Sequence, residues 1–270
     1  MKKSLRVNIV GAGNVATHIS KALFAAGVEI VTIYSRNFIN ARALTRQFES
    51  KAVDNLKDLD CNVDLNIVTI KDDAISEVAN FLDKNVPVVH SSGSASIAIF
   101  DGFEKFGVLY PLQTFSKQRV LDIAAIPFLI EGNTKDFENW LIAFCEKYLS
   151  DNAFHADTKK RSEIHLAAVF ACNFTTQLLL EADKLLSKTN LDLSLLHPLI
   201  KETVDKSLEL GPLTAMTGPA KRGDKATIKK HLDQIEEEEL KGCMLFYLNE
   251  LNLIFNNSFF IYPVFCTNGE

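Results

Sequence analysis

Residues 7–16 read VNIVGAGNVA, a G-x-G-x-x-A motif that follows an apolar run and opens a helical stretch. Gly11 permits a tight turn, Gly13 lets the backbone approach a pyrophosphate, and Ala16 lets the helix pack closely on a sheet. The N–H groups at the start of the helix then face the phosphates, with the helix dipole behind them. The motif predicts a bound dinucleotide, and the alternative is the same turn without a cofactor. The residues expected at the phosphates are Gly11, Ala12, Gly13, Asn14 and Val15.

The sequence around this motif alternates between two kinds of segment. Apolar, β-branched runs at 5–10, 29–34, 65–70, 87–90, 107–109 and 126–130 predict strands, and stretches at 14–26, 39–48, 74–82 and 135–149 predict helices. Apolar strands separated by helices are typical of a doubly wound, mostly parallel sheet. The predicted fold class is therefore an α/β Rossmann domain over residues 1–152.

Beyond residue 152 the strand pattern ends. Helical stretches follow at 159–188, 194–210, 225–239 and 240–256, with a break rich in Gly and Pro at 211–223. We therefore predict an all-α C-terminal domain over 153–270, joined to the first by a hinge at Asp151-Asn152. Three local signals go with these helices: Gly27 as a left-handed C-cap, and Asp73 and Asp224 as N-caps.

The end of the second predicted strand bears on the choice of cofactor. Residues 32–37 read TIYSRN, without the carboxylate that accepts hydrogen bonds from the ribose of NAD. Ser35 and Arg36 suit the additional 2′-phosphate of NADP, because a hydroxyl donates to phosphate and a guanidinium pairs with it. NADP is therefore expected rather than NAD; the alternative is a solvent-facing Arg36 in a loop.

Composition excludes several classes of partner. The net charge of −5 argues against nucleic acid, which requires a surplus of Lys and Arg. Five scattered cysteines without a C-x-x-C pair predict neither disulfides nor zinc, and favour a reducing, cytoplasmic location. The six histidines lack metal-ligand spacing, and no membrane-spanning stretch is expected. The apolar tail at 251–266 is interpreted as a packing or dimer-interface segment, and the alternative is a segment that contacts a membrane.

Five short segments carry a family resemblance, and they lie in this order at 11–16, 70–75, 90–94, 110–115 and 217–224. On these segments the chain resembles Rossmann-like NADP oxidoreductases with a helical C-terminal domain of unknown function, which are similar in architecture to pyrroline-5-carboxylate reductase and the β-hydroxyacid dehydrogenases. The resemblance implies NADP binding and dehydrogenase or reductase activity, without naming a substrate. In related two-domain reductases a C-terminal loop reaches the partner's cleft, which implies a homodimer.

Ligands of an open α/β sheet bind beyond the carboxyl ends of its strands, so the segments after the later strands are expected to line the cleft. Thr69, Ile70 and Lys71 follow the third predicted strand. Ser91, Ser92 and Gly93 follow the fourth, in a turn with small residues; the alternative for these serines is helix capping. Gln113 and Thr114 follow the fifth as hydrogen-bonding candidates, or as part of a loop packed around Pro111.

The stretch 160–180 is the predicted catalytic helix. At 100° per residue His165, Cys172 and Thr176 form a polar line, flanked by Arg161 and Asn173. His165 is the candidate general acid, because its intrinsic pKa is near neutral, and Asn173 would orient the substrate. The alternative is a satisfied His and Asn at a domain interface. The β-hydroxyacid dehydrogenases carry a Lys and an Asn on the corresponding helix, and the equivalent Lys is not evident here.

Arg222, in the loop 217–224, is the third candidate catalytic residue, as a clamp for a carboxylate or phosphate. Together these residues predict an oxidoreductase that transfers a hydride between NADP(H) and a small carbonyl, imine or hydroxy-acid substrate. Two alternatives stay open. One is a non-catalytic NADP(H) sensor, which would not oxidise NADPH; the other is a structural protein with an empty cleft, which NADPH would not stabilise.

Overall fold

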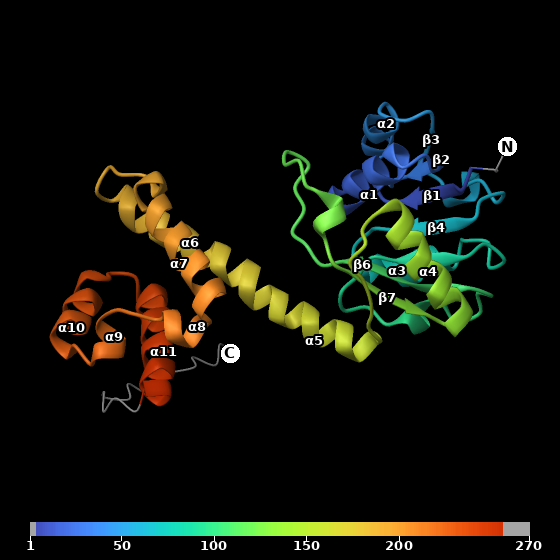
Figure 1. Cartoon of the computed structure of the whole chain (residues 1–270). Helices are drawn as coiled ribbons and strands as arrows, with labels where there is room; N and C mark the ends of the chain where they lie inside the picture. The colour runs from blue at the N-terminus through green and yellow to red at the C-terminus, as the bar shows by residue number, and fades with distance from the viewer. Residues whose placement is uncertain (1–3, 256–270) are drawn as a thin grey trace, which may run out of the picture. The chain divides into compact units, whose positions relative to one another are not determined.

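The computed structural model describes residues 4–255, except the side chains of residues 252 and 255. It divides into two compact units, Met1–Phe174 and Thr175–Glu270. The first unit carries the sheet and the second is helical (Figure 1). The predicted fold class, an α/β Rossmann domain followed by an all-α domain, is confirmed. Most of the predicted interface segment at 251–266 lies outside the described residues.

The sheet has eight strands in the order β3-β2-β1-β4-β5-β6-β7-β8. Neighbouring strands in the sheet are parallel, except that β6 and β7 are antiparallel to each other. All six predicted strands are present. Strands β3 and β8 were not predicted, because their sequences KAV and AFH are not apolar, β-branched runs. The bounds are β1 Arg6–Val10, β2 Glu29–Tyr34, β3 Lys51–Val53, β4 Leu65–Val68, β5 Val88–His90, β6 Phe106–Pro111, β7 Phe128–Gly132 and β8 Ala153–His155.

Helices cover both faces of the sheet because its strands are apolar on both faces. One hydrophobic cluster joins Val7, Ile9 and Ile67 to α1 (Asn14–Ala25), α2 (Phe38–Thr45) and α4 (Lys135–Tyr148). The other joins Val10 and Val68 to α3 (Asp72–Ala79) and to the short helix η2 (Ile97–Phe100). Alternate residues of β1 therefore enter opposite cores, as the two-residue period of a strand requires.

The second unit contains only helices in its described part. Its first helix continues one that starts in the first unit: α5 (Thr158–Ala168), a π-helical stretch (Val169–Phe174) and α6 (Thr175–Ser187) follow without a break. The division of the units therefore falls inside a helix, whereas the sequence suggested a hinge at 151–152, just before β8 joins the sheet. The remaining helices are η5 (Leu193–Leu196), α7 (His197–Leu210), α8 (Pro212–Ala215), α9 (Pro219–Arg222), α10 (Lys225–Gln234) and α11 (Glu238–Phe255).

Two of the three predicted caps are present. Gly27 follows α1 with φ +83°, and Asp224 accepts a hydrogen bond from the Thr227 backbone N–H (3.1 Å) at the start of α10. The prediction for Asp73 is wrong. Helix α3 begins at Asp72, two residues before the predicted start at 74, so Asp73 lies inside its first turn, where its negative charge interacts favourably with the helix dipole.

The continuous helix Thr158–Ser187 differs from expectation in one respect. By length and composition, with a mean hydropathy of 1.2 over 18 residues, it could cross a membrane, although no spanning stretch was predicted. Soluble core helices meet the same criterion, so the finding is weak.

Candidate functional site

A cavity of about 750 Å³ lies at the carboxyl ends of β1, β2 and β4. Ten of the predicted cofactor residues line it: Gly11, Ala12, Gly13, Asn14, Val15, Ser35, Arg36, Thr69, Ile70 and Lys71. Ser91, Ser92 and Gly93 are not among its lining residues. Strands β1, β2, β4 and β5 are parallel, so both groups lie at the same edge of the sheet.

The glycine turn has the geometry that the motif predicts. Gly11 has φ +127°, and a Cβ there would lie 2.6 Å from the carbonyl oxygen of Thr69, so both backbone and space demand glycine. A Cβ on Gly13 would meet no described atom within 4 Å, so this position is open to a ligand. Gly13 is also the N-cap of α1 and supplies no side-chain cap, which leaves the first N–H groups of the helix for an anion.

The end of β2 holds Ser35 and Arg36 at the cavity wall. The backbone N–H of Ser35 donates to Val53 on β3 (3.1 Å), which ties the turn to the sheet edge. The Ser35 hydroxyl accepts from the backbone N–H of Asn37 (3.3 Å), so its own proton is free to be donated. Asn37 in turn caps α2 by accepting from Ile39 (3.0 Å). Short local bonds thus hold Ser35 and Arg36 side by side.

Lys117 is a cavity residue that the sequence analysis missed. Its Nζ donates to the carbonyl of Ala12 in the glycine turn (2.8 Å). The same loop is attached to α1 twice more: Asn14 donates to Phe115 O (2.9 Å) and His18 Nε2 to Ser116 O (3.0 Å). About a hundred residues separate these partners, so no local pattern signals the contact. The lining cations Arg36, Lys71 and Lys117 outnumber the one lining carboxylate, Glu77, which suits a polyanion.

Hydrogen bonds of its own serine side chains stabilise the turn after β5. The hydroxyl of Ser92 donates to Asp72 (2.6 Å) and accepts from the backbone N–H of Ala95 (2.9 Å). Ser94 donates to the same carboxylate oxygen (2.7 Å). Ser92 therefore stabilises the turn itself, whereas the cap of the following short helix η2 is Ser96, outside the predicted serines. A cofactor role for Ser91, Ser92 and Gly93 stays a prediction.

A second cavity of about 420 Å³ lies at the end of β6, against α5 and the π-helical stretch. It unites residues predicted separately: Gln113 and Thr114 from the loop after β6, and His165, Cys172 and Asn173 from the helix. Its other lining residues are Tyr110 and small or apolar side chains: Leu112, Ile164, Ala167, Ala168, Val169 and Ala171.

The π-helical stretch Val169–Phe174 changes the register on which the polar line was predicted. A constant 100° per residue no longer holds across a π-helix, which turns less per residue than an α-helix. Cys172 and Asn173 still share a cavity with His165, but Thr176 lies in the second unit. Such stretches are frequently found at functional sites.

His165 contacts two residues that come from other elements. Its Nδ1 lies 2.9 Å from the hydroxyl of Tyr110, and the two rings meet edge to face. A Cβ on Gly93 would lie 2.5 Å from the same Nδ1, so the imidazole rests against a backbone without a side chain. The role of this glycine is to admit the ring.

Arg161, one turn before His165, is fully buried. Its guanidinium pairs with Glu131 on β7 and donates to the carbonyl of Ala95 (2.6 Å). Thr158 at the start of α5 also donates to Glu131 (2.9 Å). These bonds fix the first turns of α5 on the sheet, so Arg161 is structural rather than part of the polar line.

Arg222 lies in the second unit, at the end of α9. Gly223 follows it with φ +73°, and Asp224 then caps α10, so the loop reverses sharply at this point. A clamp role for Arg222 stays a prediction.

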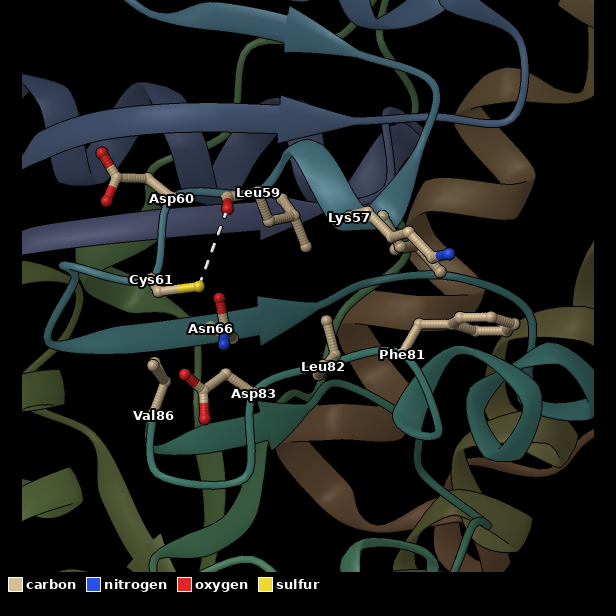
Figure 2. Close-up of a pocket in the computed structure, with 10 residues that line it drawn as sticks. Lys57, Leu59, Asp60, Cys61, Asn66, Phe81, Leu82, Asp83 and Val86 are labelled. Atoms are coloured by element: carbon tan, nitrogen blue, oxygen red, sulfur yellow. Dashed lines mark hydrogen bonds between the residues drawn. The ribbon is translucent and has the colours of Figure 1, made fainter.

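A smaller cavity of about 190 Å³ lies at the opposite, amino-terminal edge of β4 and β5 (Figure 2). Cys61, Asn66 and Asp83 line it, and the thiol of Cys61 lies 4.0 Å from the carbonyl oxygen of Leu59. Ligands of open α/β sheets bind at the carboxyl ends of the strands, so we assign this cavity no part in cofactor binding.

Two family models match the chain. Residues 126–243 match the domain of unknown function DUF2520, and residues 1–74 match shikimate / quinate 5-dehydrogenase. No curated protein sequence matches the chain.

Solved structures match nearly the whole chain. A reductive aminase from Aspergillus terreus in complex with NADPH and ethyl-5-oxohexanoate has a TM-score of 0.64 at 13% identity, covering 95% of this chain and 89% of its own. A 1-pyrroline-5-carboxylate reductase from Streptococcus pyogenes has a TM-score of 0.62 at 17% identity, covering 94% of each chain. At these identities the likeness concerns the fold.

A third structure is nearer in sequence. A protein from Bacteroides fragilis, described as a candidate NADP oxidoreductase, is 35% identical with a TM-score of 0.87, covering 93% of this chain and 98% of its own. The sequence resemblance stated above is thereby confirmed: this chain belongs to the Rossmann-fold oxidoreductase family that includes the Bacteroides fragilis protein.

Proposed function

We propose that this protein is an NADP-dependent oxidoreductase that transfers a hydride between NADP(H) and a small carbonyl, imine or hydroxy-acid substrate. The observation that carries the proposal is the 750 Å³ cavity, which combines an open glycine turn with Ser35 and Arg36. The family relationship to a candidate NADP oxidoreductase supports it.

The cavity residues fit the parts of the nucleotide. The N–H groups at the start of α1 and the open position at Gly13 would hold the pyrophosphate. Arg36 and the Ser35 hydroxyl would hold the 2′-phosphate, and Thr69 to Lys71 would follow the ribose toward the nicotinamide. When bound, the nicotinamide supplies the hydride.

The second cavity, of about 420 Å³, would hold the substrate. His165 would protonate the oxygen or nitrogen of the reduced double bond, and Asn173 would orient it. Arg222 would clamp a carboxylate or phosphate on the substrate. Turnover of NADPH with any member of a carbonyl and imine panel separates this proposal from a non-catalytic sensor.

Removing the guanidinium at Arg36 is expected to weaken NADPH binding specifically. Charge-assisted hydrogen bonds are worth about 1.5–3 kcal/mol, so Arg36→Ala should raise the dissociation constant of NADPH roughly 10- to 100-fold. The dissociation constant of NADH, which has no 2′-phosphate, should change less than about twofold. Isothermal titration calorimetry measures both.

Arg42→Ala is the matched control, because Arg42 is exposed on α2 and does not line the cavity. It should leave both constants unchanged. Equal weakening of NADPH and NADH by Arg36→Ala would count against the 2′-phosphate assignment, and no binding of either nucleotide by the unmodified protein would refute the proposed function.

The second unit supports a homodimer. Leu178, Leu199, Leu208 and other large apolar side chains are exposed on its helices. In its described part only Ala215, Ile228 and Leu232 are buried hydrophobics, too few for a helical domain to form its own core. We infer that a second copy of this chain covers these helices.

Analytical ultracentrifugation is therefore expected to give twice the chain mass at micromolar concentration. Leu208→Glu, at a side chain that is 81% exposed, should shift the protein toward monomer and lower its Tm. Glu209→Lys on the same helix is the control and should leave the mass unchanged. A monomeric unmodified protein would contradict the inference.

The cysteines support a reducing, cytoplasmic location. In the described part of the chain Cys61, Cys145 and Cys243 are free thiols. Free thiols persist where glutathione and thioredoxin keep them reduced.

A further inference from the structure

We propose that Tyr110 is a positioning residue that holds the imidazole of His165 in one orientation before and after the proton transfer. The proposal rests on the proposed function, in which His165 is the general acid. Tyr110 is the first residue of the segment 110–115, one of the five that carry the family resemblance.

The pair is formed by residues from different elements. Tyr110 lies near the end of β6 and His165 in the second turn of α5, and both line the 420 Å³ cavity. Their hydroxyl and Nδ1 are 2.9 Å apart, within hydrogen-bonding distance. Among the described residues no hydrogen bond engages Nε2, which leaves that nitrogen for a ligand in the cavity.

Gly93 restricts the ring from a second direction. The imidazole contacts its backbone so closely that a Cβ would lie 2.5 Å from Nδ1 and 2.6 Å from Cγ. Gly93 itself is fixed by the turn in which Ser92 bonds Asp72. The Nδ1 side of the ring is therefore packed between a rigid turn and the Tyr110 hydroxyl.

A phenol can hold this nitrogen in both protonation states of the ring. Its oxygen accepts the Nδ1–H of the imidazolium and, after Nε2 has lost its proton, the Nδ1–H of the neutral ring. Burial raises the pKa of Tyr110 above its ordinary value, so the phenol keeps its proton at neutral pH.

The proton balance of a reduction then follows. When the carbon of a C=O or C=N bond takes the hydride, the π electron pair moves to the oxygen or nitrogen. That atom takes the proton from Nε2 of the imidazolium, which becomes a neutral ring. Nδ1–H stays on the Tyr110 oxygen throughout, so the ring does not turn during the transfer. Solvent later returns a proton to Nε2.

Tyr110→Phe tests the proposal by removing one oxygen atom and keeping the ring. We expect kcat to fall about 10- to 100-fold, less than the roughly 10²–10⁴-fold that general acid catalysis itself contributes. KM, the NADPH dissociation constant and Tm should stay near their original values. In ¹⁵N spectra of histidine-labelled protein, the Nδ1 signal of His165, assigned by its loss in His165→Gln, should shift.

Tyr148→Phe is the matched control, since Tyr148 is half-buried on α4 and lines neither cavity. It should change neither kcat nor the His165 signal. Gly93→Ala is a second test of the same pair, because its methyl group would displace the imidazole while the phenol stays in place. This variant should also lower kcat and shift the Nδ1 signal of His165.

An unchanged His165 signal or an unchanged kcat in Tyr110→Phe would overturn the proposal. A fall in kcat accompanied by an equal loss of folded protein would also overturn it, because the hydroxyl would then be structural. The spectra do not depend on a substrate. If the unmodified protein turns over no member of the substrate panel, the proposed function fails while the Tyr110–His165 pair is still tested.

Discussion

Replacing Arg161 with methionine is expected to lower the free energy of unfolding by about 3–5 kcal/mol. The Arg161 side chain is 0% exposed and its partner Glu131 only 13% exposed, so the pair is shielded from water. Methionine fills much of the space but leaves the Glu131 carboxylate without its cation and the Ala95 carbonyl without its donor. Removing one member of a buried pair is costly because the other charge stays desolvated.

Urea unfolding followed by circular dichroism measures this change. Lys159→Met is the matched control. Lys159 lies in the first turn of the same helix, its Nζ is 3.9 Å from Oε1 of Glu163, and both side chains are largely exposed. Exposed pairs contribute about 0–1 kcal/mol, so the control should lose little. The double variant Arg161→Met with Glu131→Gln should recover part of the stability, because the unpaired charge is gone. A loss below about 1 kcal/mol in Arg161→Met would show that the pair does not stabilise the fold.

The residues that line the 750 Å³ cavity could be predicted largely from sequence because the patterns that signal them are local. The turn at Gly11 and Gly13 and the pair Ser35 and Arg36 each need only a few neighbouring residues and a strand to precede them. Parallel strands then bring their carboxyl ends to one edge, so Thr69 to Lys71 follow from strand order alone. Lys117 could not be predicted as a lining residue, because it contacts Ala12 from a loop 105 residues away in the sequence.

The 420 Å³ cavity could be predicted only in part, because long-range packing forms it. His165 and Asn173 were found by helical periodicity, but the partners of His165, Tyr110 and Gly93, come from separate strand ends. Arg161 was placed beside the polar line, since helical spacing cannot distinguish a buried ion pair with Glu131 on β7 from a ligand-facing charge. The π-helical stretch has no signal in the residue pattern, because every argument from spacing assumed an α-helix.

His165→Ala is expected to lower kcat about 10²–10⁴-fold, the range in which general acid catalysis contributes. The nucleotide should bind as before, because His165 does not line the larger cavity. Removal of the ring leaves a space beside Gly93 and Tyr110, so added imidazole should restore part of the rate; a loss of rate through misfolding would not be restored. The measurement is NADPH oxidation against imidazole concentration, with binding checked by calorimetry.

The control for this experiment is His231→Asn, at an exposed histidine on α10 that lines neither cavity. Unchanged turnover in His165→Ala would remove His165 from the mechanism, and with it the reason for Tyr110 to hold the ring. A fall in kcat without rescue, at an unchanged Tm, would leave His165 essential but would argue against proton transfer from an imidazole. Rescue that strengthens with the acidity of the imidazolium ions of a series of substituted imidazoles, compared at equal concentration of the protonated form, would identify the transferred proton as part of the rate-limiting step, since proton transfer follows Brønsted behaviour.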